Sequence, residues 1–260
     1  MQKPREWLRE KSIAKQVLKD ANVVLEVVDA RIPLETRNSV IKQLARERNK
    51  ELIVVLNKID LVPDNFLKKA KDYIEKEYKT VLFSAIKKKG IEQLMNILKN
   101  IAQEKKLIKV GVLGYPNVGK SSLINALKKR KIATTSPKPG MTRGKQLIKL
   151  DERIFLIDTP GIITLELPED LALKGSWIPD KLEDPVEVAL KFIEKLIEKS
   201  PKSLEDLYKV KVLPNPVETL ENIGNKLNFK AKGGDVDYDR TAKKILWDWL
   251  KGNLKAYWLE

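Results

Sequence analysis

The residues best suited to chemistry in this chain form a glycine-bounded stretch, Gly114-Tyr-Pro-Asn-Val-Gly-Lys-Ser121. The stretch fits the pattern G-x-x-x-x-G-K-[ST] at every fixed position. In such a loop the glycines let backbone N–H groups converge on phosphate oxygens, Lys120 can reach the β- and γ-phosphates, and the Ser121 hydroxyl can ligate Mg²⁺. A helical pattern at residues 122–129 follows, so a helix N-terminus would add to the anion site. The pattern predicts a nucleotide phosphate site, and the alternative is a chance glycine-rich turn.

A second motif, Asn57-Lys-Ile-Asp60, follows an apolar run at residues 52–56. At the end of a strand, the Asp60 carboxylate can accept hydrogen bonds from both N1–H and N2–H₂ of guanine, a donor pair that adenine lacks. We expect Asn57 to tie this loop to its neighbours and the stem of Lys58 to cover one face of the base. Alone, the tetrapeptide is also compatible with an ordinary surface turn.

Three shorter signals complete the candidate site. Ser84-Ala85 follows another apolar run, and a backbone N–H there could contact the guanine O6. Asp158-Thr-Pro-Gly161 fits D-x-x-G, in which Asp158 would hold Mg²⁺ through water and the Gly161 N–H would meet the γ-phosphate. Thr142, in a loop rich in Thr, Ser, Pro and Gly at residues 133–144, is placed to ligate Mg²⁺ only when a γ-phosphate is present.

These motifs define the residues that we expect to form the site. The metal ligands would be Ser121, Thr142 and Asp158, and the residues acting in catalysis would be Lys120, Thr142 and Gly161. The residues expected to contact the nucleotide are Asn57, Lys58, Asp60, Ser84, Ala85, Asn117, Val118, Gly119, Lys120, Ser121, Ser122, Thr142 and Gly161.

The elements that must position these residues alternate along the first two thirds of the chain. Apolar runs predict strands at residues 22–29, 52–56, 80–83, 108–113, 145–150 and 153–157. Helical patterns predict a basic amphipathic helix in residues 1–20 and further helices at 38–48, 65–77 and 90–103. Strands that alternate with helices and are mostly apolar on both faces predict an α/β fold with a mostly parallel sheet.

The pattern changes beyond about residue 165. Amphipathic helices are predicted near residues 185–199, 203–209, 216–224 and 237–252, with one short strand at Leu227-Asn-Phe-Lys230. We therefore expect two domains, an α/β domain at residues 1–165 and an all-α domain at residues 166–260.

The composition is that of a charge-rich globular protein with an excess of cations. The 260 residues include 51 Lys and Arg against 36 Asp and Glu, a net charge of +15. Such an excess favours a polyanionic partner, nucleic acid first and an anionic membrane second, although a generally lysine-rich proteome would also produce it. The absence of cysteine suits a reducing cytosol. No apolar run approaches the ~20 residues needed to span a bilayer, so we expect no membrane partner.

The order of the motifs is unusual. An ordinary GTPase of the P-loop class has the phosphate loop first, whereas here N-K-x-D and S-A precede the phosphate loop, Thr142 and D-x-x-G. The sequence therefore resembles the circularly permuted GTPases, most closely the YlqF/RbgA type of ribosome-assembly GTPase. The resemblance covers nearly the whole chain and extends to three other segments, Asp29-Ala-Arg-Ile-Pro33, Pro139-Gly-Met-Thr-Arg143 and Lys232-Gly-Gly-Asp-Val-Asp237.

The resemblance implies a circularly permuted P-loop GTPase domain followed by a helical domain that binds RNA or the ribosome. It implies a GTP-hydrolysing switch with slow basal turnover that binds ribosomal RNA and acts in large-subunit assembly. GTP or GDP and Mg²⁺ would be its ligands, and we expect a cytoplasmic monomer. Two features depart from relatives of this type. The chain has no histidine, which bacterial members carry near the N-terminus, and Ile86 follows Ser84-Ala85 where many GTPases have lysine.

Ile162 follows Gly161 where Ras-like proteins have the glutamine that orients the attacking water. An aliphatic side chain forms no hydrogen bond, so another group must position the water. The candidates are a K⁺ ion at Asn117 and a group supplied by the bound ribosomal particle, while a loop-stabilising role for Asn117 is equally open.

Two other functions remain compatible with parts of the sequence. A P-loop ATPase or nucleotide kinase would use the same phosphate loop, but Asn57-Lys-Ile-Asp60 argues against it. A non-catalytic RNA-binding module would keep the nucleotide only as a structural ligand.

Overall fold

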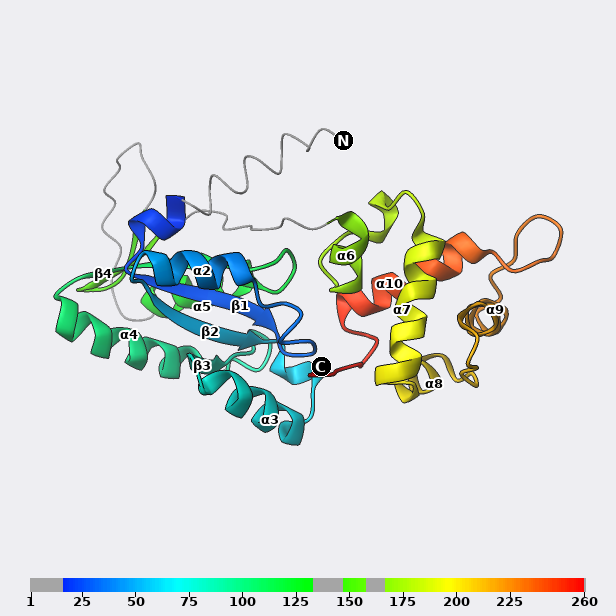
Figure 1. The fold of residues 1–260 in the computed structure, drawn as a ribbon, viewed down its shortest axis with the longest axis horizontal. Helices are drawn as coiled ribbons and strands as arrows, with labels where there is room; N and C mark the ends of the chain where they lie inside the picture. Colours follow the sequence, from blue (N-terminus) through cyan, green and yellow to red (C-terminus); the bar gives the residue numbers. More distant parts are fainter. Residues whose placement is uncertain (1–15, 133–146, 158–166, 260) are drawn as a thin grey trace. The chain divides into compact units, whose positions relative to one another are not determined.

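The computed structural model describes residues 16–132, 147–157 and 167–259 (Figure 1). The described residues fall into two compact units, one within residues 1–165 and the other within residues 166–260. Expected features at Thr142 and in residues 158–162 lie outside the described residues, as does most of the N-terminal helix predicted at residues 1–20.

The first unit is built on a six-stranded sheet of described residues, in the order β3-β2-β1-β4-β6-β5. All neighbouring strands run parallel except β5, which is antiparallel to β6. The strands are β1 (Val23–Asp29), β2 (Glu51–Asn57), β3 (Lys79–Leu82), β4 (Ile108–Leu113), β5 (Leu147–Asp151) and β6 (Ile154–Ile157). The predicted α/β fold with a mostly parallel sheet is confirmed.

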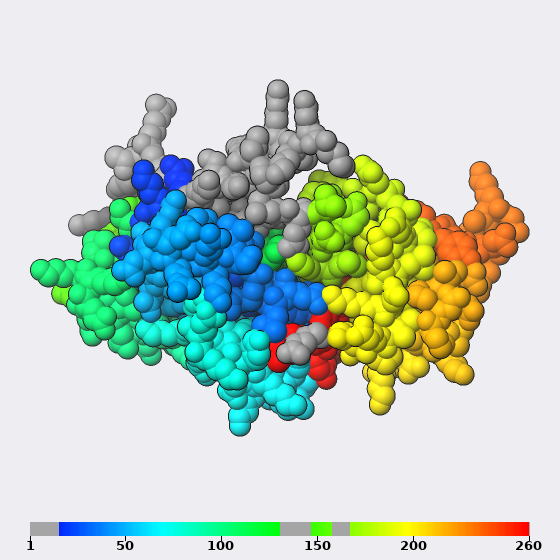
Figure 2. Space-filling view, in the orientation of Figure 1, coloured from blue at the N-terminus to red at the C-terminus, as the bar shows by residue number. Residues whose placement is uncertain are grey.

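Helices cover both faces of this sheet. They are α2 (Ser39–Glu47), α3 (Asp64–Glu75), α4 (Ile91–Lys105) and α5 (Lys120–Ile132), and Figure 1 shows α2 and α4 on opposite sides of the strands. All seven residues of β1 are buried, as expected for a strand covered on both faces. In Figure 2 the segments of α2 and α3, coloured blue and cyan, form adjoining surface on one side of this unit.

A buried carboxylate fixes α2 to the central strand. Glu26 of β1 accepts hydrogen bonds of 2.7 Å from the Arg37 side chain and from the backbone N–H of Asn38. The Asn38 side chain in turn caps α2 by accepting from the N–H groups of Val40 and Ile41. Burial raises the pKa of Glu26, although the Arg37 guanidinium opposes the shift. The alignment of α2 on the sheet therefore depends on a polar contact inside the core.

The second unit is helical in its described residues. Its helices are α6 (Pro168–Leu173), α7 (Pro185–Lys199), α8 (Lys202–Tyr208), α9 (Pro216–Lys226) and α10 (Tyr238–Lys251). Trp249 is fully buried, with its ring centroid 5.2 Å from Phe192 and 5.8 Å from Trp258. Its indole N–H donates to the Leu173 carbonyl at 3.0 Å, so the polar end of the ring is satisfied inside the core.

The short strand predicted at Leu227-Asn-Phe-Lys230 is wrong. Only one isolated bridge forms there, between Lys230 and Val236. Asn228 has a left-handed φ of 54°, which interrupts an extended segment before a ladder can begin. The prediction also missed α6, a helix of six residues that is too short for a periodic pattern. In the described ranges, no helix combines the length and apolarity needed to cross a membrane.

Candidate nucleotide-binding site

The carboxyl ends of four neighbouring parallel strands bring the described motifs to one edge of the first unit's sheet. Asp29 ends β1, Asn57 ends β2, Ser84 follows β3, and Gly114 follows β4. In open α/β sheets this edge is where ligands bind. The parallel topology alone therefore gathers residues that are far apart in the sequence.

The Asn57 side chain joins the second motif to the phosphate loop. Its Nδ2 donates to the Val118 carbonyl at 2.6 Å, and the contact is buried. Gly119 makes this approach possible, because a Cβ at that position would lie 1.9 Å from Asn57 Nδ2. Gly119 also has φ +98°, a conformation that side-chain-bearing residues rarely adopt. The loop and the strand end are thus held together by a contact that tolerates only glycine.

The Lys120 side chain is held by backbone carbonyls of the phosphate loop. Its Nζ donates to the Gly114 carbonyl at 2.9 Å and also to the Tyr115 carbonyl. Lys120 is half-buried, while Ser121 and Ser122 are exposed in the first turn of α5. The cation, the hydroxyls and the helix N-terminus therefore share one region, which is the arrangement that a polyphosphate requires.

Asp60 and Ser84 lie together at the same sheet edge, where β2 and β3 end. The Ser84 hydroxyl donates to Asp60 Oδ1 at 2.5 Å and accepts from the backbone N–H of Lys87 at 3.1 Å. The carboxylate is thereby oriented while half-exposed, and Ala85 beside it is exposed. This geometry suits a carboxylate that reads a base edge, because one oxygen is anchored and the group remains accessible.

The structure also reveals a buried ion cluster that the sequence interpretation did not assign. Lys58 Nζ lies 2.8 Å from Asp29 Oδ2, and Arg31 binds the same carboxylate through Nη2 at 2.7 Å and Nε at 3.0 Å. Asp29 and Arg31 are almost completely buried. The ammonium group of Lys58 is therefore fixed under the loop by the β1 strand end, which leaves its aliphatic stem available to a base.

Two cations around one carboxylate determine its charge. Burial alone would raise the pKa of Asp29, but Arg31 and Lys58 outweigh burial and hold the pKa well below the ordinary value of aspartate. Burial lowers the pKa of Lys58, and Asp29 opposes that shift while Arg31 adds to it. The cluster thus contains an ionised carboxylate whose removal would leave two buried cations without their counter-ion.

The described residues fit a guanine nucleotide. The Asp60 carboxylate, the support for Lys58 and the glycine-bounded loop with its cation occupy one sheet edge. Of the three residues expected to hold Mg²⁺, the structure describes Ser121, and Thr142 and Asp158 lie outside the described residues. Asn117 is exposed and has a left-handed φ of 56°.

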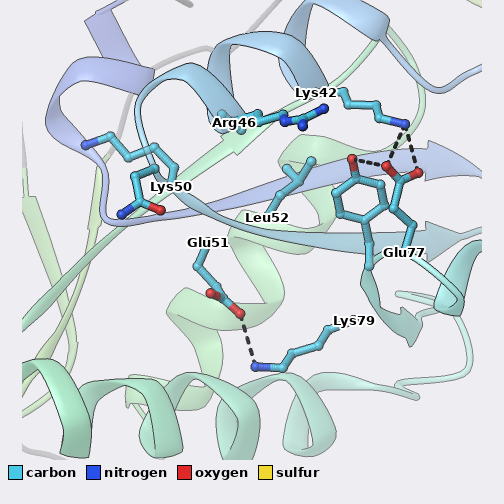
Figure 3. Close-up of a pocket in the computed structure, with 10 residues that line it drawn as sticks. Lys42, Arg46, Lys50, Glu51, Leu52, Glu77 and Lys79 are labelled. Atoms are coloured by element: carbon cyan, nitrogen blue, oxygen red, sulfur yellow. Dashed lines mark hydrogen bonds and ion pairs between the residues drawn. The ribbon is translucent and has the colours of Figure 1, made fainter.

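A separate pocket of about 480 Å³ lies at the opposite ends of the strands (Figure 3). Its charged side chains are largely paired with one another, since Lys42 bonds Glu77 and Lys79 bonds Glu51. It contains no glycine-bounded loop. The lining residues are Lys42, Ala45, Arg46, Asn49, Lys50, Glu51, Leu52, Glu77, Tyr78 and Lys79. This pocket is not the nucleotide site.

Two family profiles match successive parts of the chain. One, described as the elongation factor Tu GTP binding domain, matches residues 11–104. The other, described as 50S ribosome-binding GTPase, matches residues 109–222. The two matches meet just before the phosphate loop, where a permuted domain would join its halves.

Known proteins resemble the chain over most of its length. Ribosome biogenesis GTPase A of Bacillus licheniformis is 33% identical over 253 residues, which cover 89% of this chain and 87% of that protein. An uncharacterized GTP-binding protein of Methanocaldococcus jannaschii is 38% identical over 249 residues, which cover 95% of this chain. The chain spans 66% of the archaeal protein's length and 36% to 48% of the lengths of fungal and plant relatives. A GDP-bound structure of YlqF shares the fold, with a TM-score of 0.67, 24% identity, and coverage of 95% of this chain and 97% of that chain.

The contact between Gly119 and Asn57 predicts a sharp mutational effect. Gly119→Ala should weaken binding of a fluorescent GDP analogue at least about tenfold, or about 1.4 kcal/mol, because the methyl group displaces the Asn57 amide. Gly233→Ala is the control, since it has a similar left-handed φ of +115° but no atom within 4 Å of its added methyl group. Equal affinities in the two variants would contradict the prediction.

The buried ion cluster predicts a pH-dependent loss of stability. Asp29→Asn should lower the free energy of unfolding by about 3–5 kcal/mol, because it leaves two buried cations uncompensated. The native pKa of Asp29 is depressed, so its contribution is present above the unfolded pKa of about 4 and is lost as the pH falls further. The difference between variant and wild type in urea unfolding should therefore stay constant from about pH 7 to about pH 5 and shrink as the pH falls below about 4.

Glu77→Gln provides the control for this prediction. It removes a carboxylate from an ion pair with Lys42 in which both side chains are substantially exposed, so the expected loss is below about 1 kcal/mol. A loss for Asp29→Asn as small as this control would show that the cluster contributes little to stability.

Proposed function

The chain belongs to the circularly permuted ribosome biogenesis GTPases of the RbgA/YlqF family, and we propose that it binds GTP and hydrolyses it in large-subunit assembly. The observation that best supports the proposal is the contact of Asn57 with Val118, which joins the guanine motif to the phosphate loop despite the reversed order of the motifs. The similarity to Ribosome biogenesis GTPase A of Bacillus licheniformis supports the assembly role.

The described residues suggest how the site prepares a nucleotide for hydrolysis. Lys120 would exchange its two loop carbonyls for phosphate oxygens, so its charge is already positioned when the nucleotide enters. Asp60 would bind the base edge while Ser84 holds the carboxylate in place. Mg²⁺, when bound, neutralises charge on the phosphates, and Ser121, Thr142 and Asp158 would hold it. The N–H of Gly161 would meet the γ-phosphate.

Basal hydrolysis should be slow because Ile162 has no group that could orient the attacking water. A K⁺ ion at Asn117 is one proposed substitute, and a group from the ribosomal particle is the other. The exposure of Asn117 beside the phosphate loop is compatible with the first.

The partner would be ribosomal RNA in a precursor of the large subunit. The net charge of +15 supports a polyanionic partner. We further propose that the chain acts as a cytoplasmic monomer and that the helical unit, residues 166–260, takes part in binding RNA or the ribosome.

Base selectivity provides the direct test of the nucleotide assignment. Asp60→Asn should weaken GTP binding by about 1.5–3 kcal/mol and shift the preference toward xanthine nucleotides, because an amide donates where guanine requires an acceptor. Calorimetric titration with GTP, ATP and XTP would measure this. Asp64→Asn is a matched control, since it removes the same charge from an exposed residue in the first turn of α3. Unchanged GTP affinity in Asp60→Asn would refute the base-reading role, and ATP binding equal to GTP binding would favour an ATPase or kinase.

The potassium proposal predicts a salt effect on turnover. At matched ionic strength, basal hydrolysis should be faster in KCl than in NaCl, because K⁺ bound at Asn117 would add positive charge beside the transferring phosphoryl group. Asn117→Ala should abolish the difference. Equal single-turnover rates in the two salts would exclude this mechanism. A rate that rises only with added large subunits would instead assign the missing group to the particle.

A further inference from the structure

The charge of the chain is divided very unevenly between its two units. Residues 1–165 contain 35 Lys and Arg against 18 Asp and Glu, a net charge of +17. Residues 166–260 contain 16 Lys and Arg against 18 Asp and Glu, a net charge of −2. The whole cationic excess therefore belongs to the GTPase unit. Because non-specific RNA affinity comes from neutralised phosphates, the electrostatic contact is expected on that unit.

We propose that the loop Ile86-Lys-Lys-Lys89, here called the lysine loop, binds the phosphate backbone of RNA beside the guanine site. This inference rests on the proposed function, in which ribosomal RNA is the partner. It goes further by assigning the electrostatic contact to a loop that the sequence interpretation left without a role.

The lysine loop is a closed structure and not a loose tail. Ser84 and Lys89 exchange two backbone hydrogen bonds of 3.1 Å, which form an isolated bridge at its base. Gly90 then turns the chain into α4, and a Cβ at Gly90 would lie 2.1 Å from the Leu82 carbonyl oxygen. A loop constrained in this way loses little backbone freedom on binding, which favours its use as a contact.

The cations of the loop are available for a ligand. Lys87, Lys88 and Lys89 are all exposed, and among the described residues none of the three forms an ion pair. Some other surface lysines of this unit are paired locally, for example Lys42 with Glu77 and Lys79 with Glu51. Three adjacent uncompensated ammonium groups match the closely spaced charges of a phosphate backbone.

The tip of the loop also carries an apolar side chain. Ile86 is 82% exposed, more than any other large hydrophobic side chain in the described residues. An exposed isoleucine beside three lysines suits RNA, whose sugars and unstacked bases present apolar surface next to phosphates. A purely acidic peptide would neutralise the lysines but offers less surface to the isoleucine.

The loop is joined directly to the base-reading carboxylate. The Ser84 hydroxyl donates to Asp60 and accepts from the backbone N–H of Lys87. RNA bound at the lysine loop would therefore lie within a few residues of the guanine pocket. The helical unit, with no net positive charge, would contribute shape-specific contacts more than electrostatic affinity.

The test is the salt dependence of RNA binding by the full chain. A fluorescein-labelled RNA hairpin would be titrated in a KCl series, and the slope of log K against log salt would be measured by anisotropy. The triple variant Lys87→Gln, Lys88→Gln, Lys89→Gln should reduce the magnitude of the slope by roughly 2 to 3, while GDP affinity stays within about twofold. The control replaces Lys68, Lys69 and Lys105 with Gln, since these are exposed lysines of the same unit on α3 and α4.

Each outcome decides between distinct alternatives. A lower slope in the loop variant with an unchanged slope in the control supports the proposal. Equal reductions in both variants would mean that only net charge matters, and an unchanged slope in the loop variant would exclude the contact. Polyglutamate would be titrated in the same way as an acidic competitor of RNA. If the loop variant loses polyglutamate binding but keeps RNA binding, the loop would be assigned to an acidic protein instead. If the wild-type chain binds neither the hairpin nor isolated large subunits, the proposed RNA partner itself fails.

Discussion

The site depends on one buried hydrogen bond, from the amide of Asn57 to the carbonyl of Val118. The two residues are 61 positions apart, and the bond joins the end of β2 to the middle of the phosphate loop. In this chain the motif proposed to read the base precedes the motif proposed to bind the phosphates. The reversal does not matter to the site, because adjacent parallel strands end at the same edge whatever their order in the sequence. What matters is that Gly119 lets the backbone come close enough for the amide to reach it.

A second constraint lies beside the loop that contains Lys58 and Asp60. Asp29 and Asn57 are direct neighbours in the pairing of β1 with β2, so the strand register places Lys58 next to the Asp29 carboxylate. Arg31 then closes around the same carboxylate, and the three charged groups fill space that an apolar core would otherwise occupy. Replacing such a cluster by hydrophobic residues is often neutral for stability. We therefore infer that the cluster contributes mainly to positioning. It fixes the ammonium group of Lys58, a residue with a left-handed φ of 64°, against the end of β1.

The sequence predicted most of the fold and the chemical types in the site. Apolar runs located all six described strands, with β4 at its observed limits. The signal is continuous in β1, β2 and β4 because these strands are buried on both faces. The phosphate loop and Asp60 could be proposed from the sequence because the chemistry expected of them depends on short local patterns. The ion cluster of Asp29, Arg31 and Lys58 was not predicted, because it arises from register between strands that are distant in sequence. The strand predicted at residues 227–230 does not form, although the local composition favours a strand. The positive φ of one residue, Asn228, interrupts the extended backbone there.

The permutation also determines which part of the sequence follows the D-x-x-G segment. In an unpermuted GTPase the D-x-x-G segment leads into the next strand of the same sheet. Here the segment ending at Gly161 is followed almost directly by the helical unit, which begins at residue 166. If Gly161 meets the γ-phosphate as proposed, release of that contact would act on the segment that connects the two units in sequence. If the lysine loop holds RNA on the cationic unit, the helical unit with its small net negative charge is the part free to change its contacts. In that arrangement electrostatic affinity would be constant through the nucleotide cycle, and nucleotide state would control only the contacts of the second unit.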